Sequence, residues 1–191
     1  MKEEARYPTV FLVTGKVHGG KTSYLLKLVE QLKHRDFKVG GFLSPGSFES
    51  GERSGFRLQN IQSGLELTLA SIRKTPGWFR YRRFWFNPDA FRQGREWISF
   101  SLSEDPDVLV IDEVGPMELE GSGWSESLVT LQNSPAPIQV WSVRETLIPE
   151  LGKRWNLPYT RVIQIEETEL AMAAEMISET IKKYKALKHN K

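Results

Sequence analysis

The sequence predicts an α/β fold, a three-layer sandwich in which a mainly parallel sheet lies between helices on both faces. Two observations predict it. Short apolar runs rich in β-branched residues alternate along the chain with segments of helical periodicity. The first of these runs leads through a glycine-rich loop directly into a helix. With 191 residues, the chain is expected to form one domain, residues 1–191.

The first two elements are expected at the N-terminal end of the chain. Thr9–Thr14 is a brief apolar run closed by glycine, which is typical of a central strand buried on both faces. Apolar residues then recur at helical spacing at Leu25, Leu28, Val29 and Leu32. This spacing predicts an amphipathic helix from Lys21 to about His34.

The middle of the chain predicts antiparallel structure. Phe37–Leu43 is expected to be a second strand, and the Gly, Ser and Pro residues of Pro45–Gly55 predict a solvated loop after it. Gly55–Ile61 and Leu65–Leu69 alternate around a Ser-Gly turn, which predicts a hairpin. Phe79–Phe86 is expected to add one more strand. A small antiparallel insertion is therefore expected at about residues 55–100.

The remaining elements return to the alternating pattern. Val108–Ile111 and Ile138–Val143 predict two strands, each followed by a segment able to form a helix. Arg161–Ile165 is expected to be the last strand, and Glu167–Leu187 the last helix. This alternation predicts a parallel sheet with right-handed crossovers.

The composition excludes several classes of site. Cysteine is absent and only three histidines occur, which excludes disulfides and cysteine-ligated zinc and disfavours a histidine-built metal site. Basic and acidic residues nearly balance, 26 against 24, so the whole chain gives no argument for nucleic acid. No secretory signal or transmembrane stretch is recognised, so a cytoplasmic protein without a membrane partner is expected.

A phosphate-binding motif joins the first strand to the first helix. The segment Gly15–Thr22 reads GKVHGGKT and fits the Walker A pattern G-x-x-x-x-G-K-[ST]. In this motif backbone N–H groups cradle phosphate, Lys21 reaches the β- and γ-phosphates, and Thr22 ligates Mg²⁺. The nucleotide-binding residues expected from it are Gly15, Lys16, Val17, His18, Gly19, Gly20, Lys21, Thr22 and Ser23. The fold is therefore predicted to be a P-loop NTPase fold.

An acidic pair follows the strand Val108–Ile111. Asp112 and Glu113 are expected at the carboxyl end of a parallel strand, where open α/β sheets bind their ligands. Asp112 is predicted to hold Mg²⁺, and Glu113 to orient or deprotonate the water that attacks the γ-phosphate. Arg144 follows the next strand at the same edge. It is expected to contact phosphate or base, although a surface ion pair explains its position equally well.

Arginine and aromatic residues alternate between Arg73 and Arg95. This region is interpreted in three ways: as a lid that supplies guanidinium groups to the γ-phosphate and an aromatic face to the base, as a platform for single-stranded nucleic acid, or as a half-buried strand. The sequence does not separate these interpretations. Nucleic acid is therefore a candidate partner that the sequence does not favour.

With these motifs in view, the chain resembles the THEP-type nucleoside-triphosphatases. The resemblance rests on Thr14–Thr22, on Gly40–Leu43 with Gly55–Leu58, and above all on Ile111–Leu119, IDEVGPMEL. It implies Mg²⁺-dependent hydrolysis of several nucleoside triphosphates to diphosphate and phosphate, with Lys21 and Glu113 as catalytic residues and Thr22 and Asp112 at the metal. Glu118 belongs to the last motif, where it either lies near the site or caps a helix.

The leading prediction is a nucleoside-triphosphatase that needs Mg²⁺. Two alternatives stay open: a small-molecule or nucleotide kinase of the same fold, and a slow nucleotide-dependent module that binds nucleic acid or a partner. The sequence does not indicate the preferred base, the physiological substrate or the oligomeric state.

Overall fold

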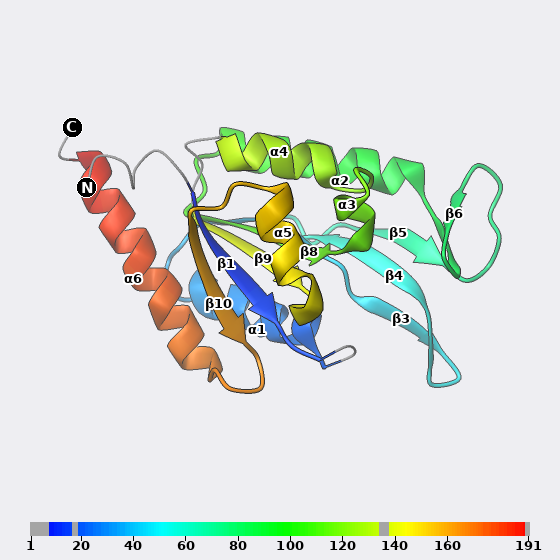
Figure 1. Ribbon diagram of the computed structural model, residues 1–191, viewed down its shortest axis with the longest axis horizontal. Helices are drawn as coiled ribbons and strands as arrows, with labels where there is room; N and C mark the ends of the chain where they lie inside the picture. Colours follow the sequence, from blue (N-terminus) through cyan, green and yellow to red (C-terminus); the bar gives the residue numbers. More distant parts are fainter. Residues whose placement is uncertain (1–7, 17–18, 134–137, 190–191) are drawn as a thin grey trace.

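Five parallel strands form the centre of the fold, in the spatial order β10, β1, β9, β8, β2 (Figure 1). The computed structural model describes residues 8–16, 19–133 and 138–189. The strands are β1 (Thr9–Thr14), β2 (Val39–Leu43), β8 (Val108–Val114), β9 (Ile138–Val143) and β10 (Tyr159–Gln164). The parallel sheet expected from the alternating pattern is confirmed. β9 lies between β1 and β8, so the end of β9 separates the glycine loop from the acidic pair.

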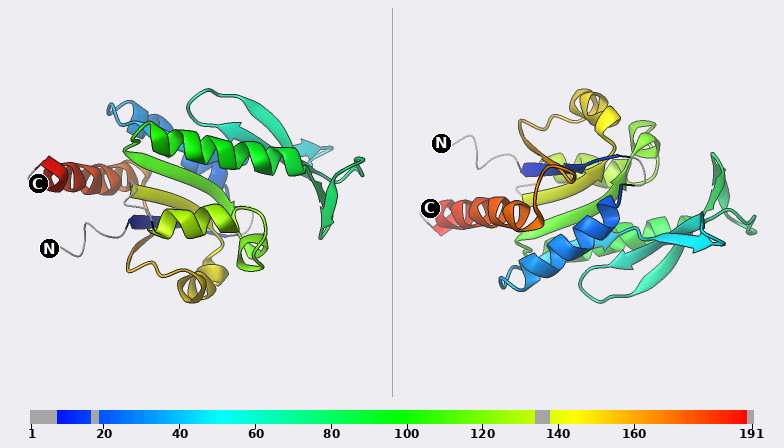
Figure 2. Two further views of the ribbon diagram at one scale, coloured as in Figure 1. Left: turned by 90° about the horizontal axis from the view of Figure 1, so that it is seen from above. Right: turned by 90° about the horizontal axis from the view of Figure 1, so that it is seen from below.

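Apolar side chains of the sheet point alternately to two cores. In β1, Val10 and Leu12 face one core, whereas Phe11 and Val13 face the other. Helices α1 (Lys21–Lys33) and α6 (Leu170–His189) cover the second core. Helices α2 (Pro88–Ser103), α4 (Ser125–Asn133) and α5 (Ile148–Arg154), with the short α3 (Pro116–Leu119) and the 3₁₀ turn η1 (Glu145–Leu147), lie on the opposite side (Figure 2). The three-layer sandwich is therefore confirmed.

Beyond β2 the same sheet continues as antiparallel strands. β4 (Glu52–Asn60) pairs with β2, and β5, β7 and β6 follow outward, with β3 beside β4. The bounds of these strands are Gly46–Glu49 for β3, Glu66–Ser71 for β5, Phe79–Tyr81 for β6 and Phe84–Phe86 for β7. The extension projects from one end of the molecule, where Figure 1 shows β6 at the tip. The expected hairpin around the Ser-Gly turn is confirmed as β4 and β5.

Three expectations in this region were wrong. Pro45–Gly55 is not a loop, because β3 and the start of β4 form a hairpin whose turn is provided by Ser50 and Gly51, both at positive φ. Phe79–Phe86 is not one strand but a second hairpin, with Arg82 at φ 54° in its turn. The insertion occupies residues 46–86, because helix α2, capped by the Asn87 side chain, begins at Pro88.

Several element ends also differ from expectation. The second strand begins at Val39 and the last strand at Tyr159, while the last helix begins at Leu170. Within the residues that the structure describes, no helix is long and apolar enough to cross a membrane.

Candidate active site

The glycine loop lies between β1 and α1, as the motif predicts. Gly20 has φ +88°, a left-handed conformation that glycine adopts without strain, and α1 begins at the next residue. The Lys21 ammonium bends back to donate hydrogen bonds to the carbonyl oxygens of Gly15 at 3.4 Å and Lys16 at 3.2 Å. Thr22 lies in the first turn of α1. Backbone N–H groups of a helix N-terminus and an ammonium therefore face the same loop.

Three other residues of the predicted nucleotide-binding set lie in the first turn of α1 or outside the described part. Ser23 follows Thr22 in the first turn and is exposed. Val17 and His18, which the motif includes, lie outside the described residues.

Glu166 is a neighbour of the loop that the sequence did not indicate. Its carboxylate accepts a 2.9 Å hydrogen bond from the Lys16 backbone N–H. A Cβ atom on Gly15 would lie 2.7 Å from Ile165 and 2.8 Å from the Glu166 carboxylate. A side chain at position 15 would therefore displace the Ile165 and Glu166 side chains, which follow β10. The hydrogen bond from Lys16 lowers the pKa of Glu166.

Asp112 is a fully buried carboxylate at the end of β8. Its oxygens accept hydrogen bonds from the Ser142 hydroxyl, from the Glu113 backbone N–H at 3.0 Å and from the Ser44 backbone N–H at 2.9 Å. These donors come from β9, from β8 itself and from the residue after β2. Three adjacent strands therefore fix the orientation of one carboxylate.

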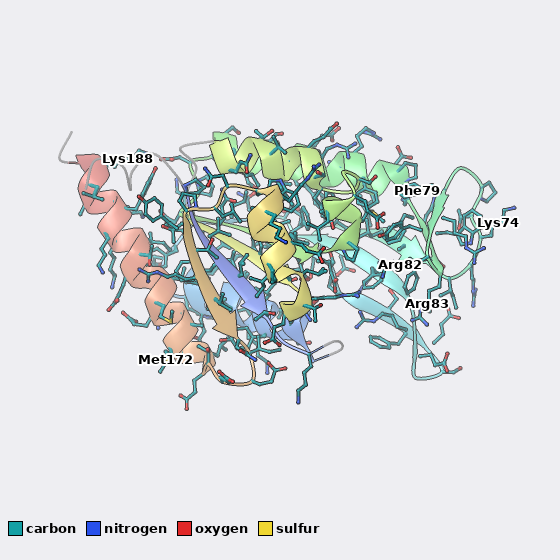
Figure 3. All side chains as sticks on the ribbon, in the orientation of Figure 1. Lys74, Phe79, Arg82, Arg83, Met172 and Lys188 are labelled. Atoms are coloured by element: carbon teal, nitrogen blue, oxygen red, sulfur yellow. The ribbon has the colours of Figure 1, made fainter. Side chains whose placement is uncertain are left out.

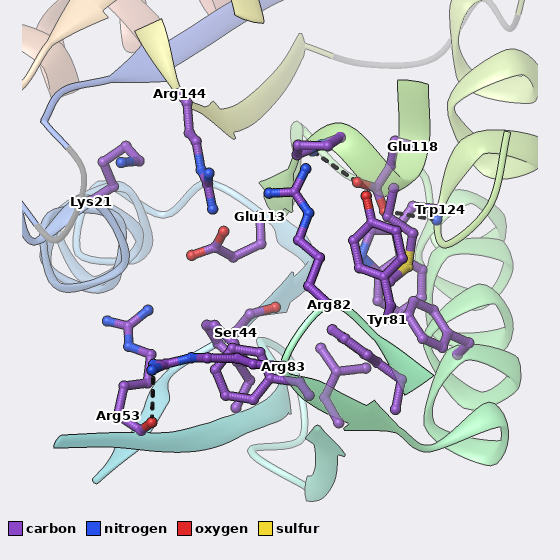
Figure 4. Close-up of a pocket in the computed structure, with 18 residues that line it drawn as sticks. Lys21, Ser44, Arg53, Tyr81, Arg82, Arg83, Glu113, Glu118, Trp124 and Arg144 are labelled. Atoms are coloured by element: carbon purple, nitrogen blue, oxygen red, sulfur yellow. Dashed lines mark hydrogen bonds between the residues drawn. The ribbon is translucent and has the colours of Figure 1, made fainter. Parts of the chain in front are cut away.

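Glu113 directs its side chain toward the glycine loop rather than along the sheet (Figure 4). Its φ is +64°, an uncommon conformation for a residue with a side chain, and the pairing of β8 with β9 shifts register at this point. Such local strain is typical of functional sites. Burial raises the pKa of Glu113 and the Asp112 carboxylate adds to the rise, whereas Lys21, Arg144 and Arg53 act in the opposite direction.

A cavity of about 550 Å³ opens beside these residues. Lys21, Glu113 and Arg144 line it together, so the structure brings one residue each from the loop, the acidic pair and the end of β9 into one space. Figure 4 shows Lys21 and Arg144 on one side of Glu113, and Tyr81 and Trp124 on the other. Arg144 forms no ion pair within the described part of the chain.

The arginine-rich region contributes to the same cavity through its second hairpin. Arg82 and Arg83, in the turn between β6 and β7, line the cavity with Tyr81, Phe84 and Phe86. The guanidinium of Arg83 donates to the Arg53 carbonyl oxygen at 3.2 Å. In contrast, Arg73 and Arg92 lie outside the cavity and pair with acidic side chains. Figure 3 shows Arg82 and Arg83 inward of Lys74, which lies at the outer end of the molecule.

Glu118 holds the turn that follows the acidic pair. The carboxylate is buried and accepts hydrogen bonds from the backbone N–H groups of Gly115 at 2.8 Å and Trp124 at 3.1 Å. Burial raises its pKa to about 7, and the two hydrogen bonds limit the rise. These contacts support the helix-capping interpretation, although Glu118 also lines the cavity.

Four residues of the site were not found by sequence reasoning: Ser44, Arg53, Ser142 and Glu166. Ser44, Ser142 and Glu166 each follow or end a strand at the carboxyl edge of the parallel sheet. Their positions at the edge were a usable signal, because ligands of open α/β sheets bind there. Arg53 belongs to β4 and lines the cavity. Its position depends on the β3–β4 hairpin, which was expected to be a loop.

Comparisons with known proteins agree on one family. The family model described as NTPase matches residues 10–177. The nucleoside-triphosphatase THEP1 of Saccharolobus solfataricus is 33% identical over 138 residues, 72% of this chain and 78% of the relative. THEP1 of Sulfurisphaera tokodaii is 30% identical over 149 residues, 77% of this chain and 84% of the relative.

Two solved structures share the fold. The solution structure of a human cancer-related nucleoside triphosphatase has a TM-score of 0.64 at 22% identity and covers 92% of this chain and 96% of its own. The crystal structure of THEP1 from Aquifex aeolicus has a TM-score of 0.62 at 23% identity, with 82% and 90% covered. The family match spans the strands, the loop and the acidic pair described above. The chain therefore belongs to the NTPase family, with the THEP1 nucleoside-triphosphatases among its relatives.

Proposed function

We propose that this chain binds a nucleoside triphosphate at the glycine loop and hydrolyses it to diphosphate and phosphate with Mg²⁺. One observation carries the proposal: Lys21, Glu113 and Arg144 come from three separate elements and line one cavity at the carboxyl edge of the sheet. This edge is where ligands bind in open α/β sheets. The NTPase family match supports the reaction class.

The loop and α1 supply the groups that hold phosphate. Backbone N–H groups at the start of α1 and the positive end of the helix dipole favour an anion there. We assign Lys21 to the β- and γ-phosphates. To bind them, its ammonium gives up its hydrogen bonds to the carbonyl oxygens of Gly15 and Lys16. Arg144 lines the cavity on the same side of Glu113 as Lys21 and is assigned to the γ-phosphate, where a guanidinium neutralises developing charge.

The chemistry of the residues present fits Mg²⁺. The Ser44 hydroxyl is buried and has no hydrogen-bond partner among the described residues, and the Ser44 backbone N–H binds the Asp112 carboxylate. Carboxylate and hydroxyl oxygens are the ligands Mg²⁺ prefers, and one or two protein oxygens suffice when phosphates supply the others. Asp112 and Thr22 are the residues that would hold the ion. When bound, Mg²⁺ neutralises charge on the β- and γ-phosphates.

Glu113 is assigned to the attacking water. Its carboxylate projects into the cavity from the end of β8, between Lys21 and Arg144 on one side and the aromatic wall on the other. A carboxylate there accepts a proton from water while the water oxygen attacks the γ-phosphorus in line with the leaving diphosphate. The positive φ of Glu113 and its backbone hydrogen bond to Ser142 at 2.8 Å keep the side chain turned toward the phosphate side.

The test is phosphate release from a panel of nucleoside triphosphates, measured with Mg²⁺ and with an excess of a chelator. Release that depends on Mg²⁺ and saturates with nucleotide supports the proposal. Binding of a fluorescent nucleotide without release under any condition contradicts it, and points instead to a slow binding module.

A further inference from the structure

We propose that the cavity beside Glu113 binds a second substrate, a planar aromatic compound that carries a phosphate monoester, and that this phosphate accepts the γ-phosphoryl group. Nucleoside monophosphates belong to this chemical class. The inference rests on the proposed function, because the glycine loop must hold the phosphoryl donor. It adds an acceptor site that hydrolysis does not need.

The size of the cavity exceeds what water requires. A water molecule occupies about 30 Å³ in the liquid, whereas the cavity measures about 550 Å³. Pockets for small molecules typically have volumes of about 300–1,000 Å³. Of the glycine loop and the first turn of α1, only Lys21 lines the cavity within the described residues. The cavity therefore extends away from the loop, on the side of the γ-phosphate that β8 and the antiparallel strands occupy.

The cationic side chains of the cavity suit a second anion. Five cationic side chains line the cavity: Lys21, Arg53, Arg82, Arg83 and Arg144. None of them forms an ion pair in the part of the chain that the structure describes, whereas Arg57, Arg73 and Arg92 in and beside the same insertion are each paired with an acid. The two carboxylates of the lining, Glu113 and Glu118, leave an excess of positive charge.

Among these cations, Arg53 offers a specific hydrogen-bond donor. Its Nε atom is buried and has no hydrogen-bond partner among the described residues. The guanidinium packs over the rings of Phe48 and Phe56, 5.3 and 5.0 Å from their centroids, so the side chain is held in place at the cavity wall. A buried donor without a partner is costly, and a turn of the guanidinium toward a phosphate in the cavity would remove that cost.

The aromatic wall of the cavity suits a flat aromatic body. Aromatic side chains from β4, β7 and α2 and the loop before α4 line it, namely Phe56, Phe84, Phe86, Phe91 and Trp124. Ring centroids of Phe56 and Phe84 lie 5.2 Å apart, and those of Phe91 and Trp124 lie 4.7 Å apart. A base can stack on such rings because every base has a flat π-face. Cations beside an aromatic wall match a compound with one phosphate and one planar ring system.

The transfer balances without another reactant. An oxygen of the acceptor phosphate forms a bond to the γ-phosphorus of the nucleoside triphosphate, and the bond from that phosphorus to the β,γ-bridging oxygen breaks. The donor leaves as a nucleoside diphosphate, and the acceptor becomes a diphosphate. An acceptor dianion needs no proton removed. Lys21 and Arg144 lie together beside Glu113 and are assigned to the charge on the transferred group.

The test uses the full chain with Mg²⁺, a nucleoside triphosphate labelled at the γ-phosphate, and AMP, GMP, CMP, UMP or dTMP as the added acceptor. We expect label to appear in a nucleoside diphosphate with at least one monophosphate, at a rate above that of phosphate release. If phosphate is released and no monophosphate acquires label, the acceptor inference is wrong while hydrolysis stands. If neither product forms, both proposals fail.

Substitutions in the aromatic wall distinguish the proposed acceptor site from the nucleoside triphosphate site at the glycine loop. Phe84→Ala removes a ring of the cavity wall, and Arg83→Gln removes a cation beside it. Each is expected to lower the ratio of transfer to hydrolysis at least tenfold. The matched controls are Phe100→Ala and Arg92→Gln, on exposed positions of α2 outside the cavity, which are expected to leave the ratio unchanged. A ratio lowered equally by the controls would overturn the assignment of the acceptor to this cavity.

Discussion

The Ser142 hydroxyl on β9 donates a hydrogen bond to the buried Asp112 carboxylate on β8. The Ser142 Oγ atom in turn accepts a 2.8 Å hydrogen bond from the Glu113 backbone N–H. One side chain thus fixes the orientation of both members of the acidic pair. The pair sits where β8 departs from regular pairing with β9. Ser142 therefore replaces the ladder contact that the irregular backbone of Glu113 has lost.

Ser142→Ala is expected to weaken the site. Removing the hydroxyl leaves the Asp112 carboxylate and the Glu113 N–H each without one partner, which costs about 1–3 kcal/mol of the free energy of unfolding. Phosphate release is expected to fall about 10- to 100-fold, as for groups that orient catalytic ligands. The control is Ser99→Ala on α2, whose hydroxyl binds only a helix carbonyl. Equal behaviour of the two variants in urea unfolding and in activity would contradict the role of Ser142.

Gly41→Ala tests the close approach of β2 to β8. Gly41 has φ +96°, and a Cβ atom there would lie 2.0 Å from the Val110 carbonyl oxygen. The variant must separate two central strands, so a loss of at least about 3 kcal/mol in the free energy of unfolding is expected. Gly152→Ala in α5 is the control, because nothing lies within 4 Å of its added Cβ. The control is expected to gain about 0.5–1 kcal/mol, and a Gly41→Ala variant as stable as wild type would refute the packing described.

Glu118 predicts a pH dependence of stability. Its pKa is raised from the ordinary 4.5 to about 7, so between these values the folded chain retains a proton that the unfolded chain releases. The contribution of Glu118 to the free energy of unfolding is therefore fully present below pH 4.5 and is lost as the pH rises to 7. At about 1.4 kcal/mol per pH unit the loss is about 3 kcal/mol.

The measurement is urea unfolding between pH 4.5 and 7.5 for wild type and Glu118→Gln. The glutamine variant does not titrate, so the stability of wild type relative to the variant is expected to fall across this range. A difference that stays constant with pH would show that Glu118 is ionised throughout.

Arg144→Gln tests the assignment of its guanidinium to the γ-phosphate. A cation that neutralises charge developing in the transition state affects the chemical step more than binding. We expect kcat to fall about 10²- to 10³-fold, with a smaller change in KM. Arg92→Gln, on an exposed ion pair of α2, is the control. If Arg144→Gln behaves as this control does, Arg144 is a surface residue without a catalytic role.

The parallel core and the loop were predictable because their signals are local. An apolar β-branched run followed by glycines and a helical period leaves few alternatives to β1, the loop and α1. The acidic pair was predictable for the same reason, since it directly follows an apolar strand. The family motif Ile111–Leu119 covers this strand end and the turn after it.

The antiparallel extension was harder to predict because its strands are short and polar on one face. β3 and β4 pair through Ser50-Gly51, the same dipeptide as in the predicted hairpin, but Gly46–Glu49 before it lacks the apolar alternation that marks a strand. In the second hairpin the turn residue Arg82 has φ 54°, a conformation that arginine rarely adopts, so the turn was not visible in the sequence. The cavity wall depends on these turns, so neither the contribution of Arg53 nor the separation of Arg82 from Arg73 was visible in the sequence.

The most direct test of the account is phosphate release from a nucleoside triphosphate with Mg²⁺, in wild type, Lys21→Ala and Glu113→Gln. Both variants are expected to lose at least about 10²-fold in kcat, and Glu113→Gln is expected to retain nucleotide binding, because its carboxylate acts on water rather than on the loop. Circular dichroism of each variant checks that it remains folded. Phosphate release at the wild-type rate by either folded variant would contradict the proposed active site.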